Sequence, residues 1–496
     1  MLSRFIFALA ILHALPLAAG PVRLSNADGS VTVEGRLLSR DGEFFRVETE
    51  FGPVTIDAGY MRCTGQGCPD PADMVARASV GGSSDMMHRL FPALLEVFAD
   101  SRGFEPTRVF VDDMTVSWEL REPESGRLIA VFDLAVIADA RVATELASAA
   151  ITLGLAHREA GATIRQDVIA LDALVPAVAL DNPRAMVTLS QLQGLLRGEV
   201  TTWERFWETT VPVSVHLPMA WEDAQNRLGL SALAPDAVIH ETLESVADTV
   251  AREPGALGLV PYSAMGNAVP LVVSGACGLA TPATRDTIRA EDYPATQPLF
   301  LQRIGADHPK VVRDFIAFAR SPSAQPVIRA AGFVDQAIGR ISFERQGGRI
   351  ANAVLLAGED PDTTAEVRDM IGALLNGERL TLTFRFRDGS SELDPQSASN
   401  IQRLADAISA GEFDGNEILF VGFSDGNGDK AGNLRLSERR ARSVRRAVAS
   451  RVTGNAPELD VFAFGELMPM ACDDTPWGAQ VNRRVEVWIK PLEVTR

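Results

Sequence analysis

Strand-like and helix-like patterns alternate over most of this chain, and that alternation is the feature that most constrains its fold. Between residues 71 and 340, short apolar runs such as 168–178 are followed by segments with helical spacing such as 189–196. A chain that alternates in this way folds into layers in which helices cover a sheet. We therefore expect an α/β domain, or two α/β lobes, over residues 71–340.

The flanking segments have other patterns. Residues 21–70 alternate apolar and polar positions between Asp-Gly and Gly-Pro turns, which predicts a small β domain whose role is contact or spacing. Residues 341–378 contain Gly-Gly and Asp-Pro breaks and one helical pattern, so we interpret them as a linker with a helix. Residues 379–496 follow the order β-α-β-α-β-β and form a last compact unit. The predicted fold class is α/β with several domains.

The first residues have the pattern of a secretory signal peptide. Arg4 precedes an apolar stretch over 5–15, which is too short to cross a membrane, and small residues follow at 18–20. We expect cleavage after Ala19, so that residues 1–19 are the leader. An uncleaved N-terminal helix is the alternative. No later stretch reaches about 18 uninterrupted apolar residues, so we expect a soluble mature chain in an exported compartment.

The charge of the chain excludes one class of partner. It has 65 acidic and 47 basic residues, a net charge of −18, and only 6% aromatic residues. Nucleic acid repels a chain this acidic unless a local basic face exists, and so few aromatic residues offer little stacking surface. We therefore expect no nucleic-acid partner.

The chain has four cysteines, and an even number in an exported chain predicts disulfides. Cys63 and Cys68 flank a glycine-containing turn, so a local bridge is expected there. Cys277 and Cys472 then remain to pair with each other, which would clamp two domains together. Zinc is the alternative for Cys63 and Cys68, but no nearby His or Cys supplies the two further ligands. We expect no metal and no cofactor.

No enzyme signature stands out. The chain has no Gly-x-Ser-x-Gly elbow, no His-Glu-x-x-His motif and no Walker loop. The histidines after the leader are isolated and lack the spacing of metal ligands. They are His88, His157, His216, His240 and His308.

Four sequence blocks in the last unit carry the most specific signal. They begin at Gly422, Asn433, Gly465 and Asn482, and the first reads Gly-Phe-Ser-Asp-Gly-Asn-Gly. In this order they resemble the OmpA-like C-terminal domain, the peptidoglycan-binding module of outer-membrane and flagellar-stator proteins. The resemblance covers residues 379–490 and implies an α/β sandwich.

The resemblance implies a pocket for the diaminopimelate of a peptidoglycan stem peptide. Asp425 and Arg440 fall on the family's binding positions, and Asn433 and Arg483 on positions that shape the pocket. An aspartate can accept hydrogen bonds from an ammonium group and an arginine can grip a carboxylate, which suits a zwitterion. Taken singly, Asp425 is typical of a turn and Arg440 of a solvated helix face. The His-Thr that usually precedes the aspartate is Phe423-Ser424 here.

Pieces of the middle domain resemble phosphate-type periplasmic substrate-binding proteins. They include Gly81-Gly-Ser-Ser84, the run around Asp172 and the segment 255–262, and the resemblance covers residues 75–338. It implies a two-lobed, type II binding-protein fold with a cleft. Gly82, Ser83, Ser84 and Asp172 are the candidate anion-binding residues, because a glycine-serine turn before a helix can offer amides and hydroxyls to an oxyanion.

Two departures weaken phosphate binding in that resemblance. The family's Arg followed by Ser-Gly-Thr is absent from the expected region, residues 217–224. Asp85 stands where a small hydroxyl residue is usual, and its carboxylate would repel phosphate or cap the helix. Helix capping is the alternative role of Ser83 and Ser84.

These observations predict a non-enzymatic periplasmic protein of a Gram-negative envelope, associated with peptidoglycan and the outer membrane. Its last domain would hold the stem peptide non-covalently, and its middle domain would serve as a sensor of a small oxyanion or as a scaffold for envelope proteins. A phosphate receptor that feeds an ABC transporter is the alternative. A wall-modifying enzyme is a third function, and the absence of a catalytic constellation makes it the weakest.

Overall fold

The computed structural model describes residues 21–26, 28–40, 44–57, 59, 61–70, 75–110, 115–182, 186–203, 211–219, 230, 232–305, 308–387, 392–455, 457–473 and 476–492. The predicted leader, residues 1–19, and the part of 217–224 from residue 220 onward lie outside this set. The chain divides into two compact units, which are described separately. No helix in the described part has the length and apolar character that a membrane span requires.

The first unit comprises residues 1–79, 98–134 and 305–317. Its N-terminal part is a β-meander with strand order β4-β3-β2-β1-β5 around a core that includes Phe45 and Val47. A disulfide joins Cys63 and Cys68 beside that core. The meander strands are β1 (Pro21–Ser25), β2 (Thr32–Arg40), β3 (Phe44–Thr49), β4 (Gly52–Asp57) and β5 (Arg62–Thr64), and β7 (Glu105–Phe110), β8 (Thr115–Arg121), most of β9 (Leu128–Val136) and of α7 (Lys310–Ala319) complete the unit.

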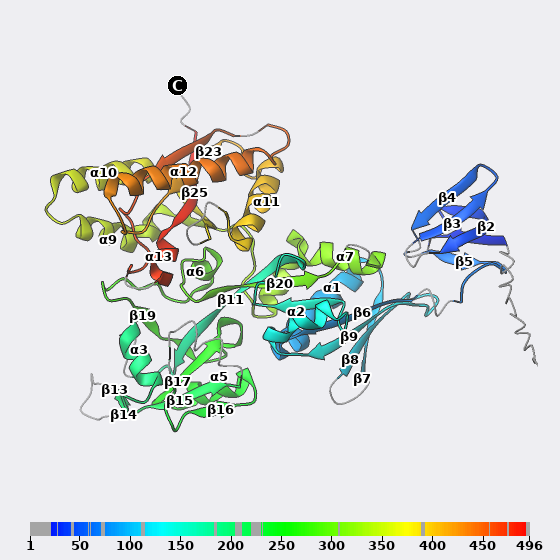
Figure 1. The fold of residues 1–496 in the computed structure, drawn as a ribbon, viewed down its shortest axis with the longest axis horizontal. Helices are drawn as coiled ribbons and strands as arrows, with labels where there is room; N and C mark the ends of the chain where they lie inside the picture. Colours follow the sequence, from blue (N-terminus) through cyan, green and yellow to red (C-terminus); the bar gives the residue numbers. More distant parts are fainter. Residues whose placement is uncertain are drawn as a thin grey trace, which may run out of the picture. The chain divides into compact units, whose positions relative to one another are not determined.

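The second unit comprises residues 80–97, 135–304 and 318–496. Its first half, here called the middle region, contains residues 80–97, 135–304 and 318–336. The sheet there runs in the order β16-β15-β17-β11-β20-β10, with the end of β6 paired to β10. The 14-residue β11 extends from the β15–β17 group to β20, as Figure 1 shows. The alternation of strands and helices predicted for this region is therefore present.

The elements of the middle region, in chain order, are as follows. The strands are β6 (Ala76–Gly82), β10 (Leu153–Ala156), β11 (Arg165–Val178), β12 (Met186–Thr188), β13 (Thr202–Trp203), β14 (Val211–Pro212), β15 (Ser214–Pro218), β16 (Val238–His240), β17 (Ala256–Pro261), β18 (Val269–Pro270), β19 (Val272–Ser274) and β20 (Thr296–Arg303). The helices are a π-helix (Met86–Leu90), α1 (Phe91–Ser101), α2 (Asp139–Ala147), α3 (Leu189–Leu196), α5 (Leu243–Arg252), α6 (Arg285–Arg289) and α8 (Gln325–Ala330).

The rest of the second unit, residues 340–492, is here called the C-terminal domain. Its sheet has the strand order β21-β22-β25-β23-β24. The strands are β21 (Arg340–Ser342), β22 (Glu378–Arg385), β23 (Asn416–Gly422), β24 (Leu459–Ala463) and β25 (Arg484–Pro491), and the helices are α9 (Gly347–Ala357), α10 (Pro361–Leu374), α11 (Pro395–Ser409), α12 (Lys430–Ala449) and α13 (Pro476–Asn482).

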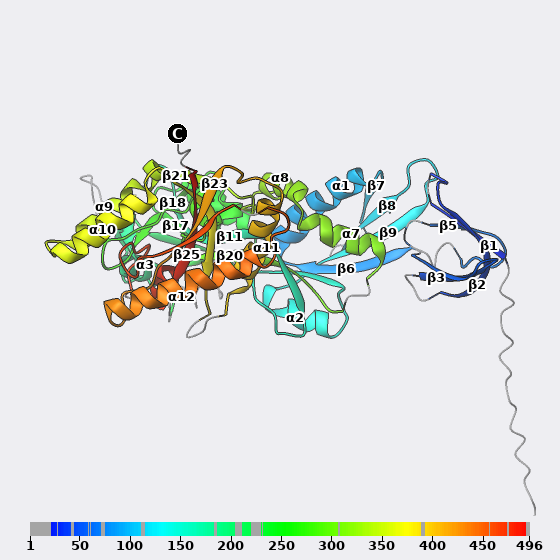
Figure 2. The ribbon, with the colours of Figure 1, turned by 90° about the horizontal axis from the view of Figure 1, so that it is seen from above.

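Helices cover both faces of this sheet. Ile418 and Phe420 pack toward α11 and α12, while Leu419 and Val421 pack toward α9 and α10. Figure 2 shows these two layers on either side of β23 and β25. The interpretation of residues 341–378 as a linker with one helix therefore differs from the structure, in which they add β21, α9 and α10 to the domain. In the sequence, the unbroken apolar run 418–421 indicates that β23 is buried on both faces of the sheet.

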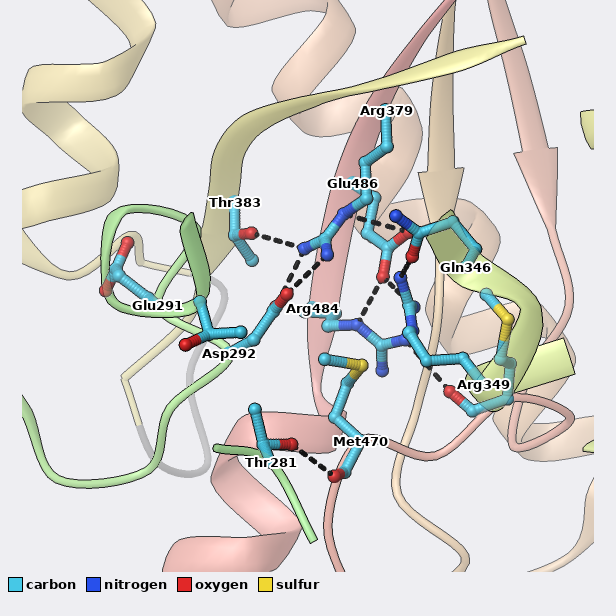
Figure 3. A network of polar contacts seen from close by, with 12 residues as sticks. Thr281, Glu291, Asp292, Gln346, Arg349, Arg379, Thr383, Met470, Arg484 and Glu486 are labelled. Carbon is cyan, nitrogen blue, oxygen red and sulfur yellow. Dashed lines mark hydrogen bonds and ion pairs between the residues drawn. The ribbon is translucent and has the colours of Figure 1, made fainter. Parts of the chain in front are cut away.

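A buried charge network joins the middle region to the C-terminal domain (Figure 3). Arg379 on β22 is 1% exposed and grips Asp292, which follows α6, through two hydrogen bonds of 2.5 and 2.8 Å. Its Nε lies 3.3 Å from Glu486 on β25, which also accepts hydrogen bonds from Arg349 and Arg484. Arg349, Arg379 and Arg484 thus compensate the charges of two buried carboxylates. These are the carboxylates of Asp292 and Glu486.

The pKa values follow from this geometry. Burial acts to raise the pKa of Glu486, but the charges of Arg349, Arg379 and Arg484 outweigh it and hold that pKa well below its usual range. Burial acts to lower the pKa of Arg379, but Asp292 and Glu486 raise it above its ordinary value. Glu486 and Arg379 therefore both stay charged. The stability of the fold then depends on keeping every partner of these buried charges.

Arg385 and a disulfide also join the same two parts. Arg385 of β22 donates to the carboxylate of Glu291 at 3.0 Å and to its carbonyl oxygen. A disulfide joins Cys277, which follows β19, to Cys472 of the C-terminal domain. Both predicted bridges are thus present in the structure. Because one of these contacts is covalent and the bonds of Arg385 to Glu291 are buried, the middle region and the C-terminal domain form a closely joined interface.

Replacing Arg379 with methionine should destabilise the protein strongly. The substitution leaves the buried carboxylate of Asp292 without its ion pair, while Glu486 keeps Arg349 and Arg484, and breaking a buried pair in this way costs about 3–5 kcal/mol. Urea unfolding of both proteins measures the difference. Arg340→Met is the matched control, because Arg340 pairs with Glu378 on the same sheet but is 44% exposed, and it should cost at most about 1 kcal/mol. Equal losses in the two variants would contradict the network's role.

Glu291 should make the stability depend on pH. Burial raises its pKa to about 8 from an ordinary 4.5, and the charge of Arg385 opposes that rise only in part. The folded state then holds this proton more tightly than the unfolded state, so the stabilisation is complete below pH 4.5 and is lost as the pH rises through about 8. Relative to Glu291→Gln, the wild type should lose stability between about pH 5 and pH 8 in urea titrations. A pH-independent difference would argue against the raised pKa.

Candidate functional site

The turn after β23 carries Asp425, α12 carries Asn433 and Arg440, and Arg483 lies between α13 and β25. Asp429 caps α12 by accepting a hydrogen bond from the Gly432 amide at 2.7 Å. A Cβ atom on Gly422 would lie only 2.2 Å from the carbonyl oxygen of Ser437, so only glycine allows α12 to approach the end of β23 this closely. Arg440 follows Ser437 by about one helical turn and is thereby carried to the turn that holds Asp425.

Asp425 and Arg483 form an ion pair in this site. Nη1 of Arg483 lies 2.8 Å from Oδ2 of Asp425, and Oδ1 of Asp425 accepts from the Asn427 amide at 3.2 Å. Asn433 instead donates to Glu466 at 2.6 Å, so its role is to hold that neighbouring carboxylate. The structure therefore brings Arg483 to Asp425 directly, whereas the side-chain amide of Asn433 is bonded to Glu466.

Arg440 is buried, at 8% exposure, rather than lying on an exposed helix turn as the sequence suggested. Its guanidinium lies over the Phe386 ring at 5.1 Å, and its Nε and Nη1 have no hydrogen-bond partner among the described residues. Burial lowers its pKa, the charge of Arg483 adds to that effect, and Asp425 opposes it. A buried guanidinium with unused donors beside one ion pair can bind a carboxylate.

The two residues that replace the usual His-Thr have separate roles. Phe423 is fully buried in the core beneath α9 and α10, with the guanidinium of Arg484 4.3 Å from its ring centroid. Ser424 is also buried, and its hydroxyl has no hydrogen-bond partner among the described residues. Ser424 therefore keeps one buried, unused hydroxyl at the residue before Asp425, while the Phe423 ring belongs to the hydrophobic core.

The candidate anion residues of the middle region are mostly engaged within the chain. The Ser83 hydroxyl donates to Asp85 at 2.5 Å, and the Ser84 hydroxyl lies 3.0 Å from Nδ1 of His88. A Cβ atom on Gly82 would lie 2.8 Å from the Leu155 carbonyl oxygen, so this glycine is needed for strand packing. These contacts leave few groups of the turn open to a ligand.

Asp172 is likewise committed to the fold. It is buried on β11, and its carboxylate accepts from the Ser263 hydroxyl at 2.6 Å, the Ser263 amide at 3.0 Å and the Ala173 amide at 2.7 Å. Burial raises its pKa, which the charge of His157 and the bonds from Ser263 oppose. It therefore ties β11 to the segment after β17.

Sequence reasoning missed two features here. Arg89, on the π-helix, donates to the Ser263 carbonyl at 3.1 Å, and its Nε and Nη2 have no hydrogen-bond partner among the described residues. His216 and His240, which the sequence presents as isolated, lie 3.0 Å apart between Nδ1 and Nε2 because β15 and β16 are parallel neighbours. The sequence carries no signal for this contact, because it arises only from the parallel pairing of β15 with β16.

Two families match this chain. Residues 385–483 match the OmpA family, and residues 124–334 match the family described as bacterial extracellular solute-binding protein. The chain carries an OmpA-family domain. The two resemblances found in the sequence are thereby confirmed: a solute-binding-like domain is followed by a C-terminal OmpA-family domain. The α/β multidomain fold class is confirmed as well, and both matched families are binding or structural families.

Relatives and solved structures were also found. A peptidoglycan-associated lipoprotein of Pseudomonas putida is 33% identical over 112 residues, covering 22% of this chain and 63% of the relative. Outer membrane porin F of Pseudomonas aeruginosa is 31% identical over 133 residues, covering 26% of this chain and 37% of the relative. The chain thus spans less than two thirds of either relative.

A crystal structure of an ABC-type phosphate transport receptor from Vibrio cholerae is also similar. It has a TM-score of 0.39 and 17% identity, and the match covers 52% of this chain and 99% of that chain. No ligand is inferred from it.

Proposed function

We propose that this protein is an exported, non-enzymatic envelope protein that binds peptidoglycan through its OmpA-family domain and holds its solute-binding-like domain as a fixed scaffold. One observation carries the first part. The buried Arg440 guanidinium has unused Nε and Nη1 donors and shares its site with Asp425 and Arg483.

The charges of this site suit the free end of a diaminopimelate residue. That end has one carboxylate and one ammonium group, and the site offers two guanidinium groups and one carboxylate. Arg440 would bind the carboxylate through a charge-assisted pair, and Asp425 would accept from the ammonium. The printed name of the Pseudomonas putida relative, peptidoglycan-associated lipoprotein, supports the same ligand class, and that of the Pseudomonas aeruginosa relative, outer membrane porin F, supports a place in the cell envelope.

The scaffold role rests on how the OmpA-family domain contacts the middle region. In the middle-region sheet, β15 and β17 lie on one side of β11, and β20 and β10 lie on the other. The disulfide lies on the first side, because Cys277 follows β19 and Val273 of β19 packs with the β15–β17 core. The ion pair between Glu159 and Arg387 lies on the other side, because Glu159 follows β10. A receptor that closes by rotating one lobe would have to break either the disulfide or the Glu159–Arg387 pair, and of these the pair is exposed and the disulfide is covalent.

Binding to peptidoglycan should depend on Arg440 and Asp425. The mature protein is expected to co-sediment with purified diaminopimelate-type peptidoglycan, and Arg440→Ala or Asp425→Ala should weaken binding at least about tenfold, since each removes a charged partner of the ligand. Arg439→Ala is the matched control, because Arg439 is the exposed neighbour on the same helix. Pelleting of Arg440→Ala to the wild-type extent would refute the proposed site.

Phosphate should not bind to the solute-binding-like domain. The Ser83 and Ser84 hydroxyls and the Asp172 carboxylate are engaged within the chain, and Asp85 adds a negative charge beside them. Calorimetric titration with inorganic phosphate should therefore give no binding heat. Binding heat that disappears in Arg89→Met would overturn the scaffold role and favour a phosphate receptor, because Arg89 retains unused donors in this region.

A further inference from the structure

One carboxylate holds both segments that carry the Asp425–Arg483 ion pair. Oδ2 of Asp473 accepts from the Gly426 amide at 2.7 Å, and Oδ1 accepts from Nδ2 of Asn482 at 2.8 Å. Gly426 directly follows Asp425, and Asn482 directly precedes Arg483. Asp473 therefore bridges the two backbone segments at the positions next to the paired side chains.

The segment that supplies Asp473 is itself held rigidly. The Asn482 amide oxygen accepts from the backbone amides of Met470 at 2.7 Å and Ala471 at 3.1 Å, and its Nδ2 also donates to the Ala471 carbonyl at 2.8 Å. Asn482 is fully buried, so these bonds are shielded from water. The position of Asp473 thus depends on the segment 470–472.

A covalent bond connects that segment to the solute-binding-like domain. Cys472, the residue before Asp473, forms the disulfide with Cys277 and accepts a hydrogen bond from the Cys277 amide at 3.0 Å. A Cβ atom on Gly275 would lie 2.4 Å from the Cys472 sulfur, so the chain around Cys277 fits closely against it. An unbroken path of bonds therefore runs from Cys277 through Cys472 and Asp473 to Gly426.

We propose that this path positions the peptidoglycan pocket, so that the affinity for the stem peptide depends on the attachment of the solute-binding-like domain. Asp473 is a positioning residue, because it acts through Asp425 and Arg483 and does not touch the ligand. A site held in its binding geometry loses less conformational freedom on binding and binds more tightly. Breaking the Cys277–Cys472 bond removes one restraint on the segment, so that only the bonds of Asn482 still hold it, and this loosens Asp473 and weakens binding. The inference rests on the proposed peptidoglycan function.

The test measures the affinity of the mature protein for a soluble, diaminopimelate-containing muropeptide by calorimetry. Asp473→Ala should weaken binding about tenfold, and the double variant Cys277→Ser with Cys472→Ser should weaken it several-fold, in line with the energy of an ordered contact. Matched controls are Cys63→Ser with Cys68→Ser, which removes the other disulfide, and Glu412→Ala, which removes one exposed negative charge from the same domain. Both controls should keep the wild-type affinity.

A double-mutant cycle separates positioning from general destabilisation. If Asp473 acts through the ion pair, Asp473→Ala should have little further effect in an Arg483→Ala background. A purely structural role would lower the affinity equally in both backgrounds. Equal effects in the two backgrounds, or wild-type affinity in either Asp473→Ala or the Cys277/Cys472 double variant, would overturn the inference.

Failure of the inference differs from failure of the proposed function. If the wild type binds the muropeptide and Arg440→Ala does not, while Asp473→Ala binds normally, only the positioning role is wrong. If the wild type itself does not bind, the proposed function is wrong and the inference falls with it.

Discussion

The buried guanidinium of Arg379 is the interaction on which the arrangement of the second unit depends. It neutralises Asp292 from the solute-binding-like domain and Glu486 from the OmpA-family sheet, and all three side chains are almost fully buried. Removing charged groups from water is costly, so such a network is stable only when the two domains stay together and every partner is present. The buried charges therefore contribute more to specifying one arrangement of the two domains than to the free energy of unfolding.

The contacts between the two domains affect the movement of the solute-binding-like domain and the site in the OmpA-family domain. A solute-binding fold usually gains its function from movement about a hinge, whereas here the OmpA-family domain contacts residues on both sides of β11. The same attachment places Cys472 and Asp473 beside the turn that carries Asp425. Both contacts are consistent with the proposed scaffold role of the middle domain and with the proposed positioning of the Asp425 site.

Much of this fold could be predicted from the sequence, because periodicity reports burial directly. The predicted order β-α-β-α-β-β of the last domain agrees with the structure except for α13, which lies between the last two strands, and the two family resemblances agree with the family matches. The second helical layer was missed, although the run 418–421 has no polar position and so indicates burial on both faces. The burial of Arg440 and the pairing of His216 with His240 could not be predicted, because they depend on tertiary packing between distant segments.

The most direct test of this account is a crystal structure of the mature protein with meso-diaminopimelate. The account predicts a carboxylate of the ligand on Nε and Nη1 of Arg440, its ammonium group on Asp425, and the Cys277–Cys472 bridge and the Arg379–Asp292 pair intact. Ligand bound in the cleft of the solute-binding-like domain, or an empty pocket at Arg440 under saturating ligand, would contradict it.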